Sequence, residues 1–130
     1  MIVAVRGVLE ATGDDWVQVR VGGVSLEVHV PASMVGALGS VGAEVHLHTH
    51  LIVREDAFTL YGFAGSDGLR LFQLLLGVSG IGPRLALGLL SALGPYNLAA
   101  AIASGDESAL ARVPGIGRKL SGRIVLELSE

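Results

Sequence analysis

The chain has 130 residues, of which 51% are apolar and none is cysteine. This length allows one medium domain or two small ones, and the apolar fraction is ample for a buried core. The lack of cysteine excludes disulfides, thiol catalysis and iron–sulfur clusters, and it fits a cytoplasmic protein. Because no stretch reaches the ~18 uninterrupted apolar residues of a membrane span and the N-terminus lacks the features of a secretion signal, we expect no membrane partner.

The net charge of −3 is unevenly distributed. Residues 1–64 hold three arginines against seven acidic residues, a net charge of −4. Residues 65–130 hold six basic residues against five acidic ones, a net charge of +1. Because affinity for phosphate depends on local charge more than on the total, the second half is the candidate for binding nucleic acid.

The first half alternates apolar and polar residues with the period of two expected of half-buried strands. Gly22-Gly23 separates two of the runs and predicts a hairpin turn. Pro31 ends the third strand, and residues 32–38 are expected to form a short helix. Together with residues 1–10 and 57–63, the pattern predicts five strands in a small Greek-key barrel of the OB-fold type.

The period changes between Gly62 and Gly68, and residues 65–130 are predicted to be entirely helical. Asp67 is a candidate cap for the first helix, and Pro95 suits the first turn of the third. We expect five helices, at residues 68–76, 83–94, 95–104, about 107–113 and 118–128. The predicted fold class is therefore α+β with two domains, a barrel at residues 1–64 and a helical domain at 65–130.

A short phrase occurs twice, 35 residues apart, as VSGIGPRL from Val78 and VPGIGRKL from Val113. A Gly–apolar–Gly turn between apolar helices predicts a tandem helix-hairpin-helix. The glycines allow positive φ and a close approach of backbone N–H groups to phosphate, and the next helix adds the partial positive charge of its N-terminus. The alternative is a pair of ordinary turns between helices. The candidate DNA-binding residues are Ser79, Gly80, Ile81, Gly82, Arg84, Pro114, Gly115, Ile116, Gly117, Arg118, Lys119 and Arg123.

Glu55 and Asp56 lie where the fourth strand should turn into the fifth. They fit an ordinary polar hairpin tip, and neighbours in a tight turn seldom converge on one metal or substrate. The remaining alternative is electrostatic, because acidic tips beside DNA repel phosphates.

His46, His48 and His50 alternate along one strand and should share a face. Such spacing can bind zinc if further ligands are present, and a solvated or interfacial strand face is the alternative.

We predict no metal, no cofactor and no catalytic residue, and no phosphate-binding loop of the ATPase type is present. Single-strand binding by the barrel is not expected, because this half is acidic and its aromatic residues suit the core or the barrel edge.

The predicted barrel and paired hairpins, with VREDA from Val53 and LYGF from Leu60, resemble the RuvA family, the Holliday-junction-binding subunits of the bacterial branch-migration machine. The similarity runs along essentially the whole chain. It implies a homotetramer, with an octamer as an alternative, that holds four-way junction DNA open and planar in recombination, repair and the SOS response. Glu55 and Asp56 match the family's acidic pin, so four copies would bring eight carboxylates near the junction centre. The hairpins match its minor-groove phosphate contacts.

The resemblance also implies a third domain that docks on a RuvB-type hexameric ATPase, with a RuvC-type resolvase as a further partner. This chain ends at Glu130, before that domain, and we expect truncation, with a natural protein that lacks the domain as the alternative. The expected role is non-catalytic. The alternatives are a general helix-hairpin-helix adaptor on duplex DNA and a DNA glycosylase or lyase, although Lys119 is the only lysine.

Overall fold

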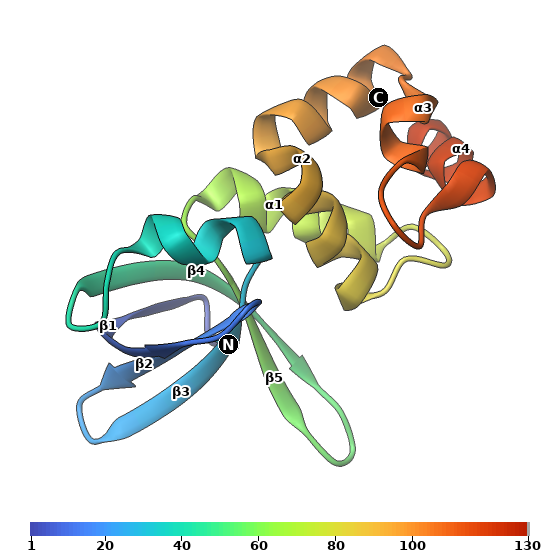
Figure 1. Ribbon diagram of the computed structural model, residues 1–130. Helices are drawn as coiled ribbons and strands as arrows, with labels where there is room; N and C mark the ends of the chain where they lie inside the picture. Colours follow the sequence, from blue (N-terminus) through green and yellow to red (C-terminus); the bar gives the residue numbers. More distant parts are fainter. Residues whose placement is uncertain (130) are drawn as a thin grey trace. The chain divides into compact units, whose positions relative to one another are not determined.

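A computed structural model describes residues 1–129 and divides the chain into two compact units between Leu69 and Arg70. This division falls within helix α1 (Ser66–Leu76). The first unit contains all the strands, and the second contains most of the helical structure (Figure 1).

Five strands form a closed barrel in the order β1-β2-β3-β5-β4, which confirms the predicted OB-type fold. All neighbouring pairs are antiparallel except the short parallel pairing of β3 with β5. The strands are β1 (Ala4–Thr12), β2 (Trp16–Val21), β3 (Val24–His29), β4 (Glu44–Val53) and β5 (Phe58–Phe63).

The barrel core contains the apolar residues of the alternating pattern. Val17 and Val19 of β2 and Leu47 of β4 are fully buried, while the residues between them face outward to varying degrees. The 3-10 helix η1 (Ala32–Leu38) packs Met34 and Leu38 against this core. The short helix predicted between the third and fourth strands is therefore present, in 3-10 form.

The helices are α1, α2 (Pro83–Ser104), α3 (Glu107–Ala111) and α4 (Gly117–Leu128). The backbone of α2 is not helical at Gly94, where φ is 76° and ψ is 161°. The two helices predicted on either side of Gly94 are thus present as two segments. Helix α1 begins two residues before the expected start, so Asp67 lies in its first turn, where the carboxylate accepts a hydrogen bond from the Gly68 amide at 2.9 Å.

Among the described residues, α2 is the one helix long and apolar enough to cross a membrane by length and composition. The break at Gly94 leaves two segments that are each shorter than the ~20 residues of a membrane span. Leu89, Leu90, Leu98 and Ile102 are buried, two on each side of the break. This burial is typical of a helix pair that contributes to a protein core.

Candidate nucleic-acid interface

The first hairpin lies between α1 and α2. The Val78 amide donates to the carbonyl of Leu75 at 3.0 Å, and the Ile81 amide donates to the carbonyl of Val78 at 3.1 Å. Gly80 has φ of 93°, which favours glycine because it has no Cβ. Ser79 and Gly80 are exposed, so the turn presents its backbone to solvent.

The second hairpin, between α3 and α4, has the same geometry. The Val113 amide donates to Leu110 and the Ile116 amide donates to Val113, each at 3.1 Å. Gly115 has φ of 90°, close to the value at Gly80. Pro114 and Gly115 are exposed, as are their equivalents in the first hairpin. The repeated phrase therefore encodes a repeated turn.

The two motifs differ at their last glycine. Gly117 has a positive φ of 64°, whereas Gly82 is extended with φ of −100°. Gly82 therefore does not use the positive φ that glycine allows. Pro83 follows Gly82 and disfavours helical conformations at the preceding residue, which accounts for its extended backbone.

The isoleucines of the two turns are anchors. Ile81 is 6% exposed and Ile116 is 3% exposed, so both residues are packed inside the helical unit. Among the hydrogen bonds of residues 1–129, none uses the amide N–H of Gly80 or Gly115. Each turn therefore combines a buried apolar anchor with an exposed, unpaired backbone donor.

The N-termini of α2 and α4, which follow the hairpins, carry neither a side-chain cap nor an acidic residue in the first turn. Helix α3 differs, because Asp106 accepts a hydrogen bond from the Ala109 amide at 3.2 Å and Glu107 lies in the first turn. Uncapped first-turn N–H groups and the positive end of the helix dipole attract anions. The two helices after the hairpins thus share an uncapped N-terminus without acidic residues, whereas the N-terminus of α3 is capped and acidic.

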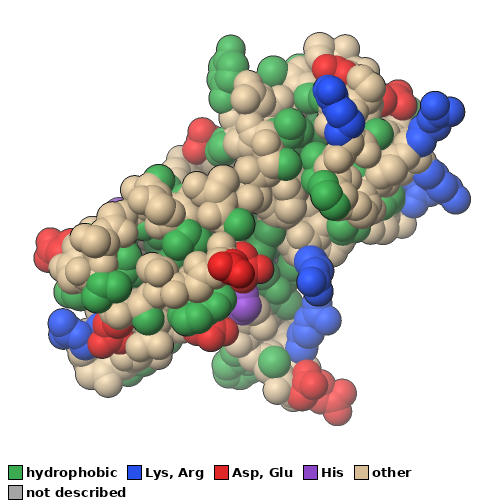
Figure 2. Space-filling view, viewed as in Figure 1, with side chains coloured by type: hydrophobic (Ala, Val, Ile, Leu, Met, Phe, Trp, Pro, Cys, Tyr) green, Lys and Arg blue, Asp and Glu red, His purple; other side chains and the backbone are tan. Residues whose placement is uncertain are grey.

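The basic residues beside the hairpins are free to meet a partner. Arg84, Arg118 and Lys119 are exposed, and within the described residues none of them forms an ion pair. Figure 2 shows basic side chains protruding around α4. Arg123 differs from these three, because it is half-buried and its Nη1 donates to the carbonyl of Ser79 at 3.2 Å.

The β4–β5 hairpin ends in the acidic pair. The Arg54 amide donates to the carbonyl of Ala57 at 2.8 Å and closes the loop that contains Glu55 and Asp56. Both acidic residues are exposed, and Phe58 at the start of β5 is 77% exposed. Figure 2 shows the acidic side chains at the tip of this hairpin. The pair is therefore accessible to a partner.

The histidines of β4 do not form a metal site with other ligands. The rings of His46 and His48 stack with centroids 4.8 Å apart, yet residues 1–129 contain no group of three or more His, Cys, Asp or Glu residues that could hold a metal ion. Partial desolvation, the charge of Arg6 and the neighbouring His48 lower the pKa of His46 below its ordinary value. These features fit a strand face that is partly open to solvent.

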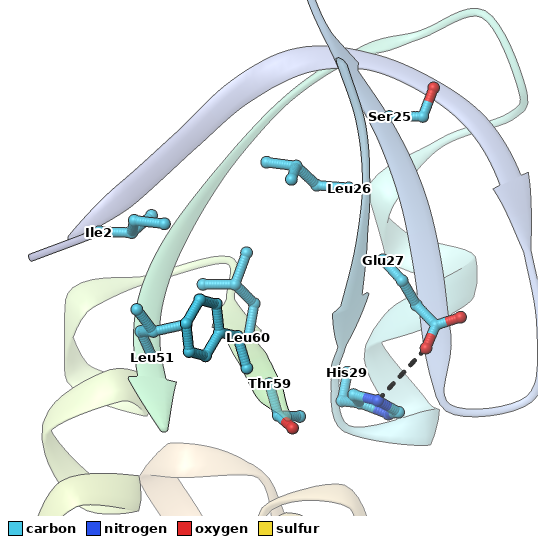
Figure 3. Close-up of a pocket in the computed structure, with 9 residues that line it drawn as sticks. Ile2, Ser25, Leu26, Glu27, His29, Leu51, Thr59 and Leu60 are labelled. Carbon is cyan, nitrogen blue, oxygen red and sulfur yellow. Dashed lines mark ion pairs between the residues drawn. The ribbon is translucent and has the colours of Figure 1, made fainter. Parts of the chain in front are cut away.

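A hollow in the barrel lies beside the short β3–β5 pairing (Figure 3). Leu26, Leu51 and Leu60 contribute apolar surface, and Nε2 of His29 lies 3.5 Å from a carboxylate oxygen of Glu27. No lysine or arginine lines this hollow in the described part of the chain. This hollow therefore differs from the basic grooves by which barrels bind single strands.

The sequence comparisons cover both units. Residues 1–62 match the RuvA N terminal domain family, and residues 72–130 match the family described as a SAM-like helix-hairpin-helix tandem. Among the relatives are proteins named Holliday junction branch migration complex subunit RuvA. The protein from Chloroflexus aggregans is 52% identical over 98% of this chain and 66% of its own length. The one from Dehalococcoides mccartyi is 47% identical over 100% of this chain and 67% of its own.

The closed barrel and the duplicated hairpins define a tandem helix-hairpin-helix protein with an OB-type N-terminal barrel. With the similarity along its whole length, the chain belongs to the RuvA family. It spans about two thirds of the length of the curated relatives that it matches.

Proposed function

We propose that this chain is a non-catalytic DNA-binding subunit that grips four-way junction DNA by its phosphate backbone, without reading base sequence. The observation that carries this proposal is the pair of equivalent hairpins. Each combines a glycine amide that is unpaired within residues 1–129, an uncapped helix N-terminus and at least one exposed basic residue without an acidic partner in that range. Backbone contacts of this kind position DNA and carry no direct sequence information, which suits a junction that must move past every base pair.

The names of the relatives support the junction as substrate, since each is called a subunit of a Holliday junction branch migration complex. We further propose that four copies assemble around the junction in the bacterial cytoplasm, and that an octamer forms if a second tetramer covers the other face. A hexameric ATPase of the RuvB type would supply the energy for migration, and a RuvC-type resolvase would act on the same junction. Binding of DNA by backbone amides and basic side chains requires no chemical step in this chain.

The acidic pair has a separate role in this proposal. Glu55 and Asp56 are exposed at a hairpin tip, and within the described residues neither carboxylate has an ion-pair partner. Carboxylates near converging strands repel phosphates and help to keep the strands apart. The pin therefore shapes the path of the DNA while the hairpins provide affinity.

Gel-shift titration of a four-way junction against a linear duplex of equal length and composition tests the proposal. We expect tighter binding to the junction, with strong salt dependence on both substrates. Equal affinity for the two DNAs would instead support a general duplex-binding adaptor. Product analysis of the same mixtures, with an abasic or damaged base in one strand, should show no cleavage or base removal.

A further inference from the structure

The two hairpins contact each other through equivalent residues. A Cβ built on Gly80 would lie 2.9 Å from Cδ2 of Leu120, and a Cβ on Gly115 would lie 2.7 Å from Cδ2 of Leu85. Leu85 and Leu120 occupy the same place in the repeated phrase, 35 residues apart, as do Gly80 and Gly115. Each turn is therefore packed against the first helical turn that follows the other hairpin.

A second contact breaks this symmetry. The guanidinium of Arg123 donates to the carbonyl of Ser79, and Arg123 lies three residues after Leu120, on the same face of α4. The position equivalent to Arg123 in the first motif is Gly88, which has no side chain to make the return contact. The first hairpin is thus held by α4 through both an apolar contact and a charged hydrogen bond.

The first hairpin also has fewer charges of its own. Arg84 is its one basic residue, because Pro83 stands where the second motif has Arg118. Phosphate binding by the first hairpin therefore depends more on the orientation of its backbone donors than binding by the second hairpin does. A hydrogen bond to the Ser79 carbonyl restrains the peptide that leads into Gly80, whose N–H is unpaired within the described chain. Hydrogen bonds from charged donors are stronger than those between neutral groups.

We propose that Arg123 is a positioning residue of the first hairpin and not a phosphate ligand. It acts from α4 through the Ser79 carbonyl, so that the two hairpins present their amides to DNA as one unit. This inference rests on the proposed function for its effect on DNA binding. Its structural part, the restraint of the first hairpin by Arg123, is testable without DNA.

The first experiment uses hydrogen exchange on the free protein. Arg123→Met removes the donor and the charge while keeping an apolar stem of similar length. We expect faster exchange at the Ile81 amide, which closes the first turn, and unchanged exchange at Ile116 in the second. Arg70→Met is the matched control, since Arg70 is exposed and has no ion pair within residues 1–129. Equal protection of Ile81 in wild type and Arg123→Met would overturn the proposal.

The second experiment measures affinity for a four-way junction at several salt concentrations. We expect Arg123→Met to weaken binding by roughly fivefold through lost coupling between neighbouring groups, with the salt slope unchanged. A phosphate ligand would instead lower the slope by about 0.9 per lost contact. That loss of slope would overturn the positioning role.

Two further variants separate positioning from general destabilisation. Arg123→Lys keeps a donor and the charge, and we expect it to restore the protection of Ile81 and most of the affinity. Arg84→Ala should weaken binding less in the Arg123→Met background than in wild type, because both changes disable the same hairpin. Additive effects would contradict the inference. Failure of the wild type to bind the junction would reject the proposed function and leave the exchange result intact.

Discussion

Individual residues near the hairpins divide into those that hold the turns and those that are free for a partner. Ile81 and Ile116 are buried anchors, and Arg123 is committed to the Ser79 carbonyl. Arg118 and Lys119 are exposed and have no acidic partner within the described residues. In the proposed function, exposed basic residues such as Arg118 and Lys119 would determine how strongly junction binding depends on salt.

The first prediction concerns Arg118→Ala combined with Lys119→Ala. Each phosphate contact that is lost removes a released counterion, so junction affinity should fall and the salt slope should decrease by roughly one per contact. Affinity measured across a salt series checks this, with Arg70→Ala as a control for net charge. An unchanged slope would show that these two side chains do not touch phosphate.

The second prediction concerns Glu10 in the barrel. Hydrogen bonds from the Ser25 hydroxyl and the Gln18 amide lower the pKa of this carboxyl, with a further contribution from Arg20, against a smaller opposing effect of desolvation. Because the pKa of Glu10 is lower in the folded protein than in the unfolded one, the ionised carboxylate stabilises the fold. This stabilisation is present above the ordinary pKa of 4.5 and is lost as pH falls through the folded value.

Glu10→Gln should therefore lower the urea midpoint of the barrel at neutral pH and flatten its decline in acid. The fluorescence of Trp16, the only tryptophan, reports on this unit. Glu44→Gln is a suitable control, since Glu44 is exposed and forms no ion pair in residues 1–129. If the urea midpoint of Glu10→Gln falls as steeply with decreasing pH as that of wild type, the stabilising role of the Glu10 carboxylate is contradicted.

At the scale of elements, the break in α2 separates the segment that follows the first hairpin from the segment that leads to α3. Gly94 has φ of 76° and ψ of 161°, a region that is essentially restricted to glycine. Pro95 then starts the second segment with its φ preset for a helix. A continuous helix would send the chain straight on from the first hairpin.

The third prediction compares two glycines of α2. Gly94→Ala should destabilise the helical unit by about 1–3 kcal/mol, because alanine is strained in that backbone region. Gly88→Ala should stabilise it by about 0.5–1 kcal/mol, since a Cβ there meets nothing within 4 Å and the residue is inside a helix. Thermal unfolding followed by circular dichroism measures both. Equal effects would show that the break does not depend on glycine.

At the scale of the whole molecule, the proposed function depends on assembly, because a single pin has no opposing copies to act with. Light scattering with and without junction DNA should show a tetramer and give its stoichiometry. This measurement also distinguishes one tetramer from two on the DNA.

The fourth prediction concerns the pin. Glu55→Gln with Asp56→Asn should leave folding intact, because both side chains are exposed in the hairpin loop. Junction binding should stay equal or become tighter as phosphate repulsion is removed, while the junction geometry changes. Gel-shift affinity and fluorescence energy transfer between labelled arms measure the two effects. Loss of binding would contradict a repulsive role.

Most of the strands and both hairpin turns were predictable, because they follow from patterns within short stretches of sequence. Alternation with a period of two predicts the strands, and the repeated Gly–apolar–Gly phrase predicts the two turns. The extended backbone of Gly82 was not predicted, although Pro83 in the sequence is a signal for it. The commitment of Arg123 to the Ser79 carbonyl was also missed, since it joins residues 44 positions apart.

The sequence by itself determined the barrel, the paired hairpins and the list of candidate residues, because these follow from periodicity, turn chemistry and repetition over short stretches. Only the tertiary structure decided which candidates are free and which are occupied. Arg118 and Arg123 look alike in the sequence, yet Arg118 is exposed with no ion pair among residues 1–129, whereas Arg123 donates a hydrogen bond to the opposite hairpin. The reason is physical: packing brings the side chain of Arg123 to the carbonyl of Ser79, and nothing local in the sequence encodes that meeting.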